Sequence, residues 1–150
     1  MVARKHRTRV VLDTNVFVRN FTGRRRDSSN KRVITLWIQR RLLQLIVSRE
    51  VIEEYLEIFE REVRMETRWL QEWRRRFESG QLCSVIGLAR RYAQSRDPDD
   101  NVFLATAAAG TSEYLITNDR DLLDLPEEFQ RTLSFAIVTP REFLRIFEEE

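Results

Sequence analysis

The sequence predicts an α/β fold of three layers, with helices on both faces of a mostly parallel central sheet. Short apolar runs alternate with helical patterns along the chain, which is typical of parallel strands joined by crossover helices. These runs are continuously apolar, as expected for strands that are buried on both faces. Gly and Pro are scarce, at 4 and 3 of 150 residues, and this argues against a loop-rich or disordered chain.

The N-terminal third predicts one strand and two helices with a loop between them. We expect the first strand at about residues 9–13 and a helix directly after it, with Thr14 or Asn15 as the cap. Residues 22–30 contain Gly, Ser and Asn but no apolar side chain, which predicts a loop. Apolar residues at three- and four-residue spacing over 33–43 then predict an amphipathic helix.

The middle of the chain predicts a second strand and two charged helices. Residues 45–47 form a short apolar run, and Ser48 can cap the helix that follows it. A further helix covers about 66–79 and is rich in arginine. One stripe of this helix carries three aromatic residues, Trp69, Trp73 and Phe77. Such a stripe is more often core packing or a subunit contact than a platform for base stacking.

The C-terminal half continues the alternation of helices and strands. The expected elements are a strand or turn at 85–86, helices at 88–93 and 101–109, and strands at 114–116 and 135–138. Leu122 begins a short helix that Pro126 breaks, and Thr139 with Pro140 caps a terminal helix over 140–148. The order of elements therefore requires right-handed crossovers between parallel strands.

The length suits one domain, with residues 1–8 as a basic lead-in and 9–150 as the folded part. No apolar stretch is long enough to span a membrane, and no signal peptide is visible. Cys83 has no second cysteine for a disulfide or a zinc site. We therefore expect a cytoplasmic protein in a reducing environment.

The net charge of +2 conceals an uneven distribution. Residues 1–32 hold ten basic and two acidic residues, a net charge of +8, whereas 113–150 hold four and ten, a net charge of −6. Basic character at one end suits a polyanionic partner such as nucleic acid. A solvated tail that keeps the protein soluble explains the same charges equally well.

Several acidic residues occur where parallel strands end or where the following helices begin. They are Asp13, Glu54, Asp97, Asp99, Asp100 and Asp119. Because the carboxyl ends of parallel strands share one edge of the sheet, we expect these acids to converge there. Acids brought together repel one another unless a cation joins them. Oxygen ligands without cysteine or a central histidine indicate Mg²⁺ or Mn²⁺.

Five short motifs occur in a fixed order across about residues 10–145. They are Val11–Val16 (VLDTNV), Ser48 with Glu54-Tyr55, Asp97–Asn101 (DPDDN), Thr117–Asp119 (TND) and Ile137–Leu144 (IVTPREFL). This set resembles PIN-domain nucleases, and most closely the branch of toxin components from bacterial and archaeal toxin–antitoxin systems. Each motif is weak alone, but five in the right order are specific. The resemblance implies a PIN-like fold and a ribonuclease that depends on Mg²⁺ or Mn²⁺.

The resemblance also implies roles for individual residues. Asp13, Glu54, Asp100 and Asp119 match the family's catalytic acids and are implied to hold one or two metal ions. Asp97 matches the Asp-Pro-Asp-Asp-Asn signature of the branch and is a further candidate ligand. The candidate hydrogen-bond partners of these ligands are Asn15, Ser48 and Thr117.

The segment 24–32 departs from the small-residue loop that is usual in this family. Its basic residues are Arg24, Arg25, Arg26, Lys31 and Arg32. They could hold RNA phosphates near an acidic centre that would otherwise repel them. Contact with a partner protein is an equally good interpretation.

The expected reaction is hydrolysis of RNA by a metal-activated water, with a carboxylate such as Glu54 accepting the proton. The resemblance further implies a cognate antitoxin protein and a homodimer or higher homo-oligomer. One alternative is a PIN-like domain that binds RNA or protein without catalysis. Another is a phosphohydrolase with an aspartyl nucleophile. It is disfavoured because Asn15 stands where its second Asp belongs, and because Lys5 and Lys31 are the only lysines.

The remaining polar residues have simpler explanations. Those expected to be ordinary surface groups are His6, Glu53, Glu57 and Asp124. Asp99 and Asp121 are each expected to cap a helix. Cys83 is expected to be a small core residue, because no neighbouring histidine could activate it.

Overall fold

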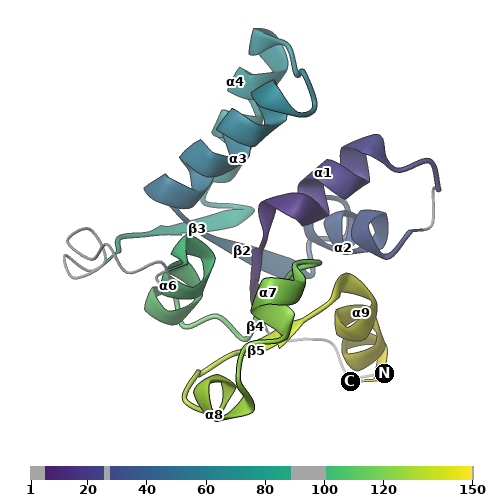
Figure 1. Ribbon diagram of the computed structural model, residues 1–150. Coiled ribbons are helices and arrows are strands. Elements are labelled where there is room, and N and C mark those ends of the chain that lie inside the picture. Colours follow the sequence, from purple (N-terminus) through teal and green to yellow (C-terminus); the bar gives the residue numbers. More distant parts are fainter. Residues whose placement is uncertain (1–5, 26–27, 89–100, 150) are drawn as a thin grey trace.

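A computed structural model describes residues 6–25, 28–88 and 101–149, in which five parallel strands form one sheet (Figure 1). The strand order is β3-β2-β1-β4-β5. The strands are β1 (Thr8–Leu12), β2 (Leu43–Ser48), β3 (Cys83–Ile86), β4 (Tyr114–Ile116) and β5 (Ala136–Val138). The predicted parallel sheet is therefore confirmed, and the segment at 85–86 belongs to an edge strand rather than to a turn.

The central strand of the sheet is β1. Its Val10 pairs with Leu45 of β2 on one side and with Tyr114 of β4 on the other. Leu12, at the end of β1, lies opposite Ile116 and is completely buried. The residue that follows β1 is consequently held at the middle of the sheet's carboxyl edge, between the ends of two neighbouring strands.

Helices flank this sheet. They are α1 (Thr14–Thr22), α2 (Ser29–Ile38), α3 (Arg49–Arg61), α4 (Thr67–Glu78), α6 (Val102–Ala109), α7 (Arg120–Leu123), α8 (Glu127–Gln130) and α9 (Pro140–Glu149). In Figure 1, α1, α2 and α9 lie on one side of the strands and α6 lies on the other. Within the described ranges, no helix is both long enough and apolar enough to cross a membrane.

The second helix is shorter than the apolar spacing over 33–43 predicts. It ends at Ile38, and Leu43 already belongs to β2. Arg41 takes a left-handed backbone conformation with φ of 53°, and the Leu42 N–H donates to the Leu36 carbonyl at 2.9 Å. The chain thus turns directly from helix to strand. The apolar spacing continues across this turn because Leu43 is buried in the core from its position in the strand. The helix predicted at 88–93 falls mostly outside the described residues.

A cluster of aromatic rings joins the first four helices. Phe17 of α1 lies at its centre and makes edge-to-face contacts with five rings at centroid distances of 4.9 to 5.9 Å. These rings belong to Trp37, Tyr55, Phe59, Trp73 and Phe77. Edge-to-face pairs of this kind contribute roughly 0.5 to 1.5 kcal/mol each beyond the burial of their area. The aromatic cluster therefore fixes α1 and α3 relative to one another.

The aromatic stripe of α4 divides between the core and the surface. Trp73 and Phe77 are buried in the aromatic cluster, so core packing explains these two. Trp69 is 50% exposed, and the guanidinium of Arg68 lies 5.0 Å from its ring centre. The stripe is therefore mainly a core feature rather than a continuous contact surface.

Candidate active site

Asp13 follows β1 directly and lies at the carboxyl edge of the sheet. Only 7% of the residue is exposed, and its Oδ2 accepts a hydrogen bond of 2.8 Å from the Thr117 hydroxyl. Its Oδ1 makes a longer contact of 3.5 Å with the Asn15 N–H. Asp13 is thus the N-cap of α1, and the prediction that Thr14 or Asn15 caps this helix is wrong. Its extended backbone, with φ of −67° and ψ of 149°, lets the side chain reach the first turn.

The electrostatic surroundings of Asp13 favour a nearby cation. Burial raises the pKa of the Asp13 carboxyl above its usual value, and the negative charge of Asp119 raises it further. The hydrogen bonds from Thr117 and Asn15 lower the pKa but do not cancel these effects. A carboxylate in this position is stabilised by a positive charge.

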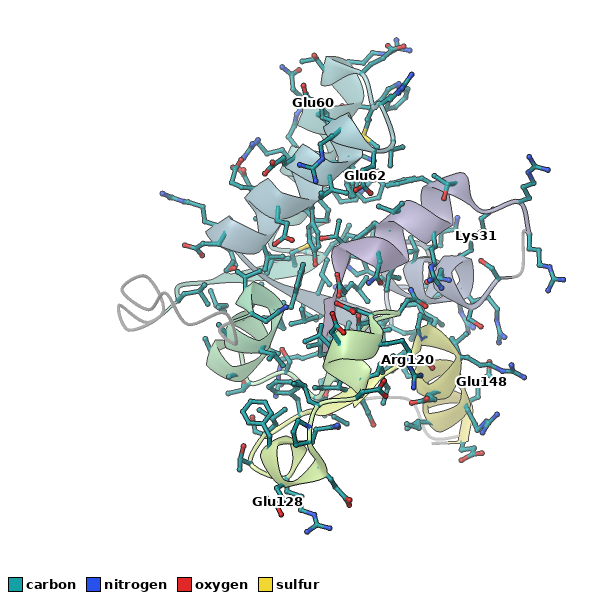
Figure 2. The ribbon with its side chains drawn as sticks, viewed as in Figure 1. Lys31, Glu60, Glu62, Arg120, Glu128 and Glu148 are labelled. Atoms are coloured by element: carbon teal, nitrogen blue, oxygen red, sulfur yellow. The ribbon has the colours of Figure 1, made fainter. Side chains whose placement is uncertain are left out.

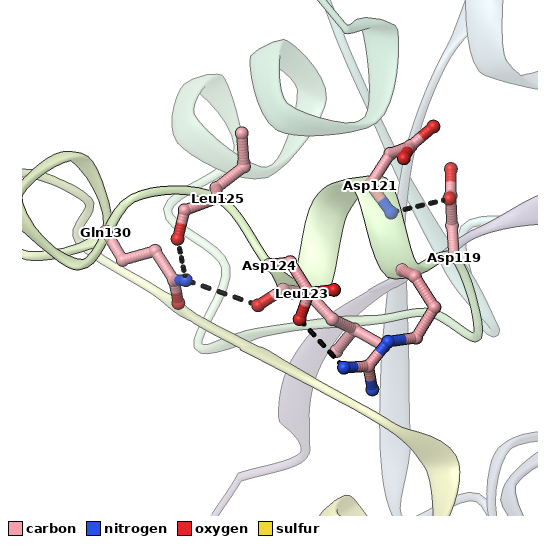
Figure 3. Close-up of polar contacts among 7 residues, drawn as sticks. Asp119, Asp121, Leu123, Asp124, Leu125 and Gln130 are labelled. Carbon is pink, nitrogen blue, oxygen red and sulfur yellow. Dashed lines mark hydrogen bonds and ion pairs between the residues drawn. The ribbon is translucent and has the colours of Figure 1, made fainter.

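Thr117 and Asp119 bring the end of β4 to the same place. Thr117 is fully buried, and its hydroxyl oxygen accepts from the Asp119 N–H at 2.9 Å while its proton goes to Asp13. One oxygen of Asp119 accepts from the Asp121 N–H at 2.9 Å, so Asp119 is the N-cap of α7 (Figure 3). The expectation that Asp121 caps this helix is therefore wrong, because the helix begins one residue earlier than Asp121.

Figure 3 shows the carboxyl groups of Asp119 and Asp121 on the same side of α7. Asp124 instead forms an ion pair of 2.9 Å with Arg120 and is exposed, in agreement with its expected surface role. Asp119 and Asp121 therefore lie on one side of α7, whereas Asp124 is neutralised by Arg120 at the surface.

Glu54 approaches the same region from α3. Its neighbour Tyr55 is fully buried, and the Tyr55 hydroxyl donates to the carbonyl of Leu12, the last residue of β1. This bond ties α3 to the strand end that presents Asp13. The pKa of the half-buried Glu54 is raised, first by burial and then by the negative charges of Asp13 and Glu57. Glu54 and Asp13 therefore lie close enough to oppose each other's ionisation.

The adjacent Glu53 has the opposite environment. Both of its carboxylate oxygens accept from Arg74 of α4, at 2.6 and 3.1 Å. This hydrogen-bonded pair lowers the pKa of Glu53. Glu53 is thus a neutralised surface charge, and the two consecutive glutamates form a matched pair for experiments.

Comparison with known proteins identifies the family of this arrangement. The family model described as PIN domain matches residues 9–121. The chain belongs to the PIN domain family. PIN domains are generally nucleases, and they generally use divalent metals. No curated protein sequence matches the chain significantly.

A solved structure supports the fold of this PIN domain. It is the crystal structure of VapBC2 from Rickettsia felis bound to a DNA fragment from their promoter. The match covers 88% of this chain and 98% of that chain, with 14% sequence identity and a TM-score of 0.50. At this identity the likeness shows the fold alone.

The other predicted partners of the ligands have distinct positions in the PIN domain. The side-chain oxygen of Asn15 accepts from both the backbone N–H and the side-chain amide of Asn118, each at 3.1 Å. Ser48 caps α3 through the Val51 N–H at 3.2 Å and contacts the Thr106 hydroxyl at 2.9 Å. Ser48 therefore sets where α3 begins, about one and a half turns before Glu54, and does not bond to a predicted ligand among the described residues.

The donors of this PIN domain suit a hard divalent cation. Asp13 is coupled electrostatically to both Glu54 and Asp119, and no Lys or Arg of the described residues forms an ion pair with these three acids. Carboxylate oxygens without soft donors fit Mg²⁺ or Mn²⁺. Within 6–25, 28–88 and 101–149, however, no three His, Cys, Asp or Glu residues lie close enough to hold a metal. The predicted ligands Asp97 and Asp100, like Asp99, lie outside these ranges.

The predicted RNA-binding residues of the PIN domain have different surroundings. Arg32 pairs with Glu148 of α9, and Lys31 Nζ donates to the Gly23 carbonyl at 2.7 Å. Figure 2 shows Lys31 and Glu148 on the side of the molecule formed by α2 and α9. Arg24 and Arg25 are exposed, whereas Arg26 lies outside the described residues. Within the described loop, Arg24 and Arg25 form no ion pair with another described residue.

Asn118 is a site residue that sequence reasoning missed. Its amide group donates to Asn15 at 3.1 Å and to Asn30 of α2 at 2.8 Å. It therefore connects the acids to the start of α2. Its position between Thr117 and Asp119 in the TND motif is the sequence feature that marks it.

Proposed function

We propose that this PIN domain is a metal-dependent endoribonuclease and the toxin component of a toxin–antitoxin system. The observation that carries the proposal is Asp13, a buried carboxylate oriented by Thr117 and facing the charges of Glu54 and Asp119. Uncompensated acids at one edge of a sheet are costly for folding unless they serve a bound cation. Membership of a family of nucleases supports the same function.

The reaction follows from the roles of these side chains. Asp13, Glu54 and Asp119 would hold Mg²⁺ or Mn²⁺, together with the predicted ligands Asp97 and Asp100. When bound, such an ion supplies a water of lowered pKa and positive charge beside the attacked phosphate. Thr117 holds one oxygen of Asp13 in place through its hydrogen bond.

Glu54 is the proposed proton acceptor. Its carboxylate is half-buried beside Asp13 and forms no ion pair with a basic residue in the described part of the chain, so it is available to accept a proton. Water attacks phosphorus as its proton passes to Glu54, the bond to the 3′ oxygen breaks, and that oxygen takes a proton. The products are a 5′-phosphate and a 3′-hydroxyl end.

The direct test is RNA cleavage by purified protein with Mg²⁺ or Mn²⁺. Asp13→Asn is expected to lower the rate at least about 100-fold. The substitution removes one negative charge from the group of Asp13, Glu54 and Asp119 that is proposed to hold the metal. Glu53→Gln, which removes the neighbouring but neutralised carboxylate, is expected to cleave like the wild type. Equal rates for Asp13→Asn and the wild type would contradict the proposal. Single-stranded DNA in a parallel reaction tests the preference for RNA.

A catalytically silent binding domain is the alternative. Such a domain would bind RNA without cleaving it and without any effect of Mn²⁺ on the rate. Chelation of divalent ions by EDTA separates the two functions, since cleavage by the proposed nuclease is expected to stop and to return when Mn²⁺ is added in excess.

We infer an antitoxin partner from the structural relative. VapBC2 is a toxin–antitoxin complex bound to DNA. A small basic or ribbon-helix-helix protein encoded in the neighbouring reading frame is the expected partner, and its co-expression is expected to suppress RNA cleavage. A homodimer belongs to the same proposal, and sedimentation of the purified chain measures it.

A further inference from the structure

A polar hollow of about 480 Å³ lies beside the acids. It is bounded by the loop before α2, the start of α2, the segment after β4 and the start of α9. Asn118 forms part of its wall and immediately precedes Asp119. Through its bonds to Asn15 and Asn30, Asn118 joins the acidic site to this hollow.

Among the described residues that line the hollow, the charged side chains are two arginines, Arg25 and Arg141. Neither arginine forms an ion pair with another residue in the described part of the chain. Seven other described arginines form ion pairs, for example Arg32 with Glu148 and Arg131 with Glu127. The hollow therefore holds two positive charges whose natural complement is an anion.

Two helices also begin at the hollow. Ser29 and Pro140, the first residues of α2 and α9, both line it. The N-terminus of a helix carries roughly +0.5 of an elementary charge. The first turn of α2 contains no acid, and the first turn of α9 contains Glu142, which does not line the hollow. The helix ends thus add to the positive potential of the arginines rather than cancelling it.

We propose that this hollow binds a backbone phosphate of the RNA strand next to the cleaved bond, with Arg25 and Arg141 as its ligands. The assignment rests on the proposed ribonuclease function. Acids that hold a metal repel the neighbouring phosphates of the same strand, so positive charge adjacent to them is needed to seat the substrate. The hollow adjoins the acids because Asn118, which lines it, bonds to Asn15, whose N–H contacts Asp13. Arginine suits the task because its planar group donates two parallel hydrogen bonds to one phosphate.

The hollow joins segments that are distant in the sequence. Arg25 belongs to the basic N-terminal part, whereas Arg141 belongs to the segment 113–150 with a net charge of −6. Ser29 and Arg141 also line a second hollow of about 310 Å³, which continues along α9 past Arg145. A strand leaving the acids can therefore follow positive side chains on this face, although Glu148 and Glu149 also line the second hollow.

The test measures binding of a labelled single-stranded RNA to the full chain in EDTA, which prevents metal-dependent cleavage. Arg25→Ala and Arg141→Ala are each expected to weaken binding roughly ten-fold at low salt. The double variant is expected to reduce the steepness of the salt dependence by about 0.7, since the two arginines contact one phosphate and each phosphate contact on a single strand contributes about 0.7. The matched control is Arg75→Ala with Arg131→Ala, which removes two arginines already paired with Glu72 and Glu127.

Each outcome separates this inference from the ribonuclease proposal. If the wild type binds RNA through the two arginines but does not cleave it with Mn²⁺, the hollow is supported and the nuclease function fails. If the wild type cleaves RNA while the double variant binds and cleaves like the control, the nuclease function stands and the hollow is overturned.

Discussion

The aromatic cluster around Phe17 and the acids around Asp13 share two helices. Asp13 caps α1, which carries Phe17, and α3 carries both Glu54 and Tyr55. Leu12 and Asp13 are consecutive at the end of β1, and Glu54 and Tyr55 are consecutive on α3. In the aromatic cluster each ring packs against complementary rings, and the Tyr55 hydroxyl bonds to Leu12. At the acidic edge like charges oppose one another instead.

The aromatic cluster holds the acidic site in place at a cost in electrostatic repulsion. Stability comes from buried aromatic surface, whereas burial and neighbouring negative charges raise the pKa of Asp13 and of Glu54 at the edge. Neither acid forms an ion pair with a basic residue in the described part of the chain. A rigid cluster prevents α1 and α3 from moving apart to relieve that repulsion.

The largest expected effect concerns stability on the aromatic side. Phe17→Ala should lower the free energy of unfolding by about 3 to 5 kcal/mol, because it leaves a cavity among five rings. This is a large part of the roughly 5 to 15 kcal/mol that a typical domain has. Urea denaturation measures the change. Trp69→Ala, at a position that is 50% exposed, should cost about 0.5 kcal/mol or less, and equal losses for the two variants would contradict the role of the cluster.

Metal removal should reveal the cost of the acidic edge. At a Mn²⁺ concentration of about 100 times Kd, the wild type should gain roughly 2.7 kcal/mol of stability. This corresponds to a rise in Tm of about 5 to 10 °C for a chain of this size. Thermal unfolding of Asp13→Asn should show no such rise. Without metal this variant should be at least as stable as the wild type, because burial disfavours the charge that it removes.

A lower Tm of metal-free Asp13→Asn than of the metal-free wild type would show that the carboxylate stabilises the fold by itself. The acids would then not be a cost to stability in the absence of metal.

Thr117 tests whether the orientation of Asp13 matters. Thr117→Val keeps the shape but removes the hydroxyl that donates to Asp13 and accepts from Asp119. Mn²⁺ affinity should fall by about 10- to 100-fold, which is usual for a partner of a metal ligand. Thr117→Ser retains the hydroxyl and should bind Mn²⁺ nearly as the wild type does. Similar affinities for the valine and serine variants would show that the hydroxyl has no role.

Cys83 is a titratable residue that is buried in the core. Burial raises the pKa of its thiol from 9.0 to about 12. A raised pKa means that the thiol stays protonated in the folded protein between pH 9 and 12, and that its contribution to stability is lost as the pH rises through this range. Iodoacetamide at pH 8 should therefore label Cys83 only after unfolding in urea. Equally fast labelling of the folded protein would show that the thiol is accessible.

Local patterns in the sequence were sufficient for the elements that carry the acids. The run at Val10–Leu12 predicts a strand buried on both faces, and the strand that ends before Thr117 was located in the same way. The structure brings Asp13 and Thr117 into contact although 104 positions separate them. The parallel sheet makes this convergence predictable, because both residues follow strands that are paired side by side.

Other features depend on contacts that no local pattern encodes. Local sequence rules predict caps at Thr14 or Asn15 and at Asp121, but the backbone places Asp13 and Asp119 there. Arg141 escaped notice because the charge balance of its segment is acidic, and only the packing of α2 against α9 brings it beside Arg25. Residue counts along a chain do not show which charges become neighbours.

Calorimetry of Mn²⁺ binding to two variants at adjacent positions tests whether the acids around Asp13 hold a divalent cation. Glu54→Gln and Glu53→Gln remove the same charge from consecutive residues of α3. The acidic edge predicts that Glu54→Gln weakens Mn²⁺ binding at least about ten-fold, while Glu53→Gln binds like the wild type. Equal affinities for the two variants, or no binding by the wild type, would show that the acids around Asp13 and Glu54 do not hold the cation.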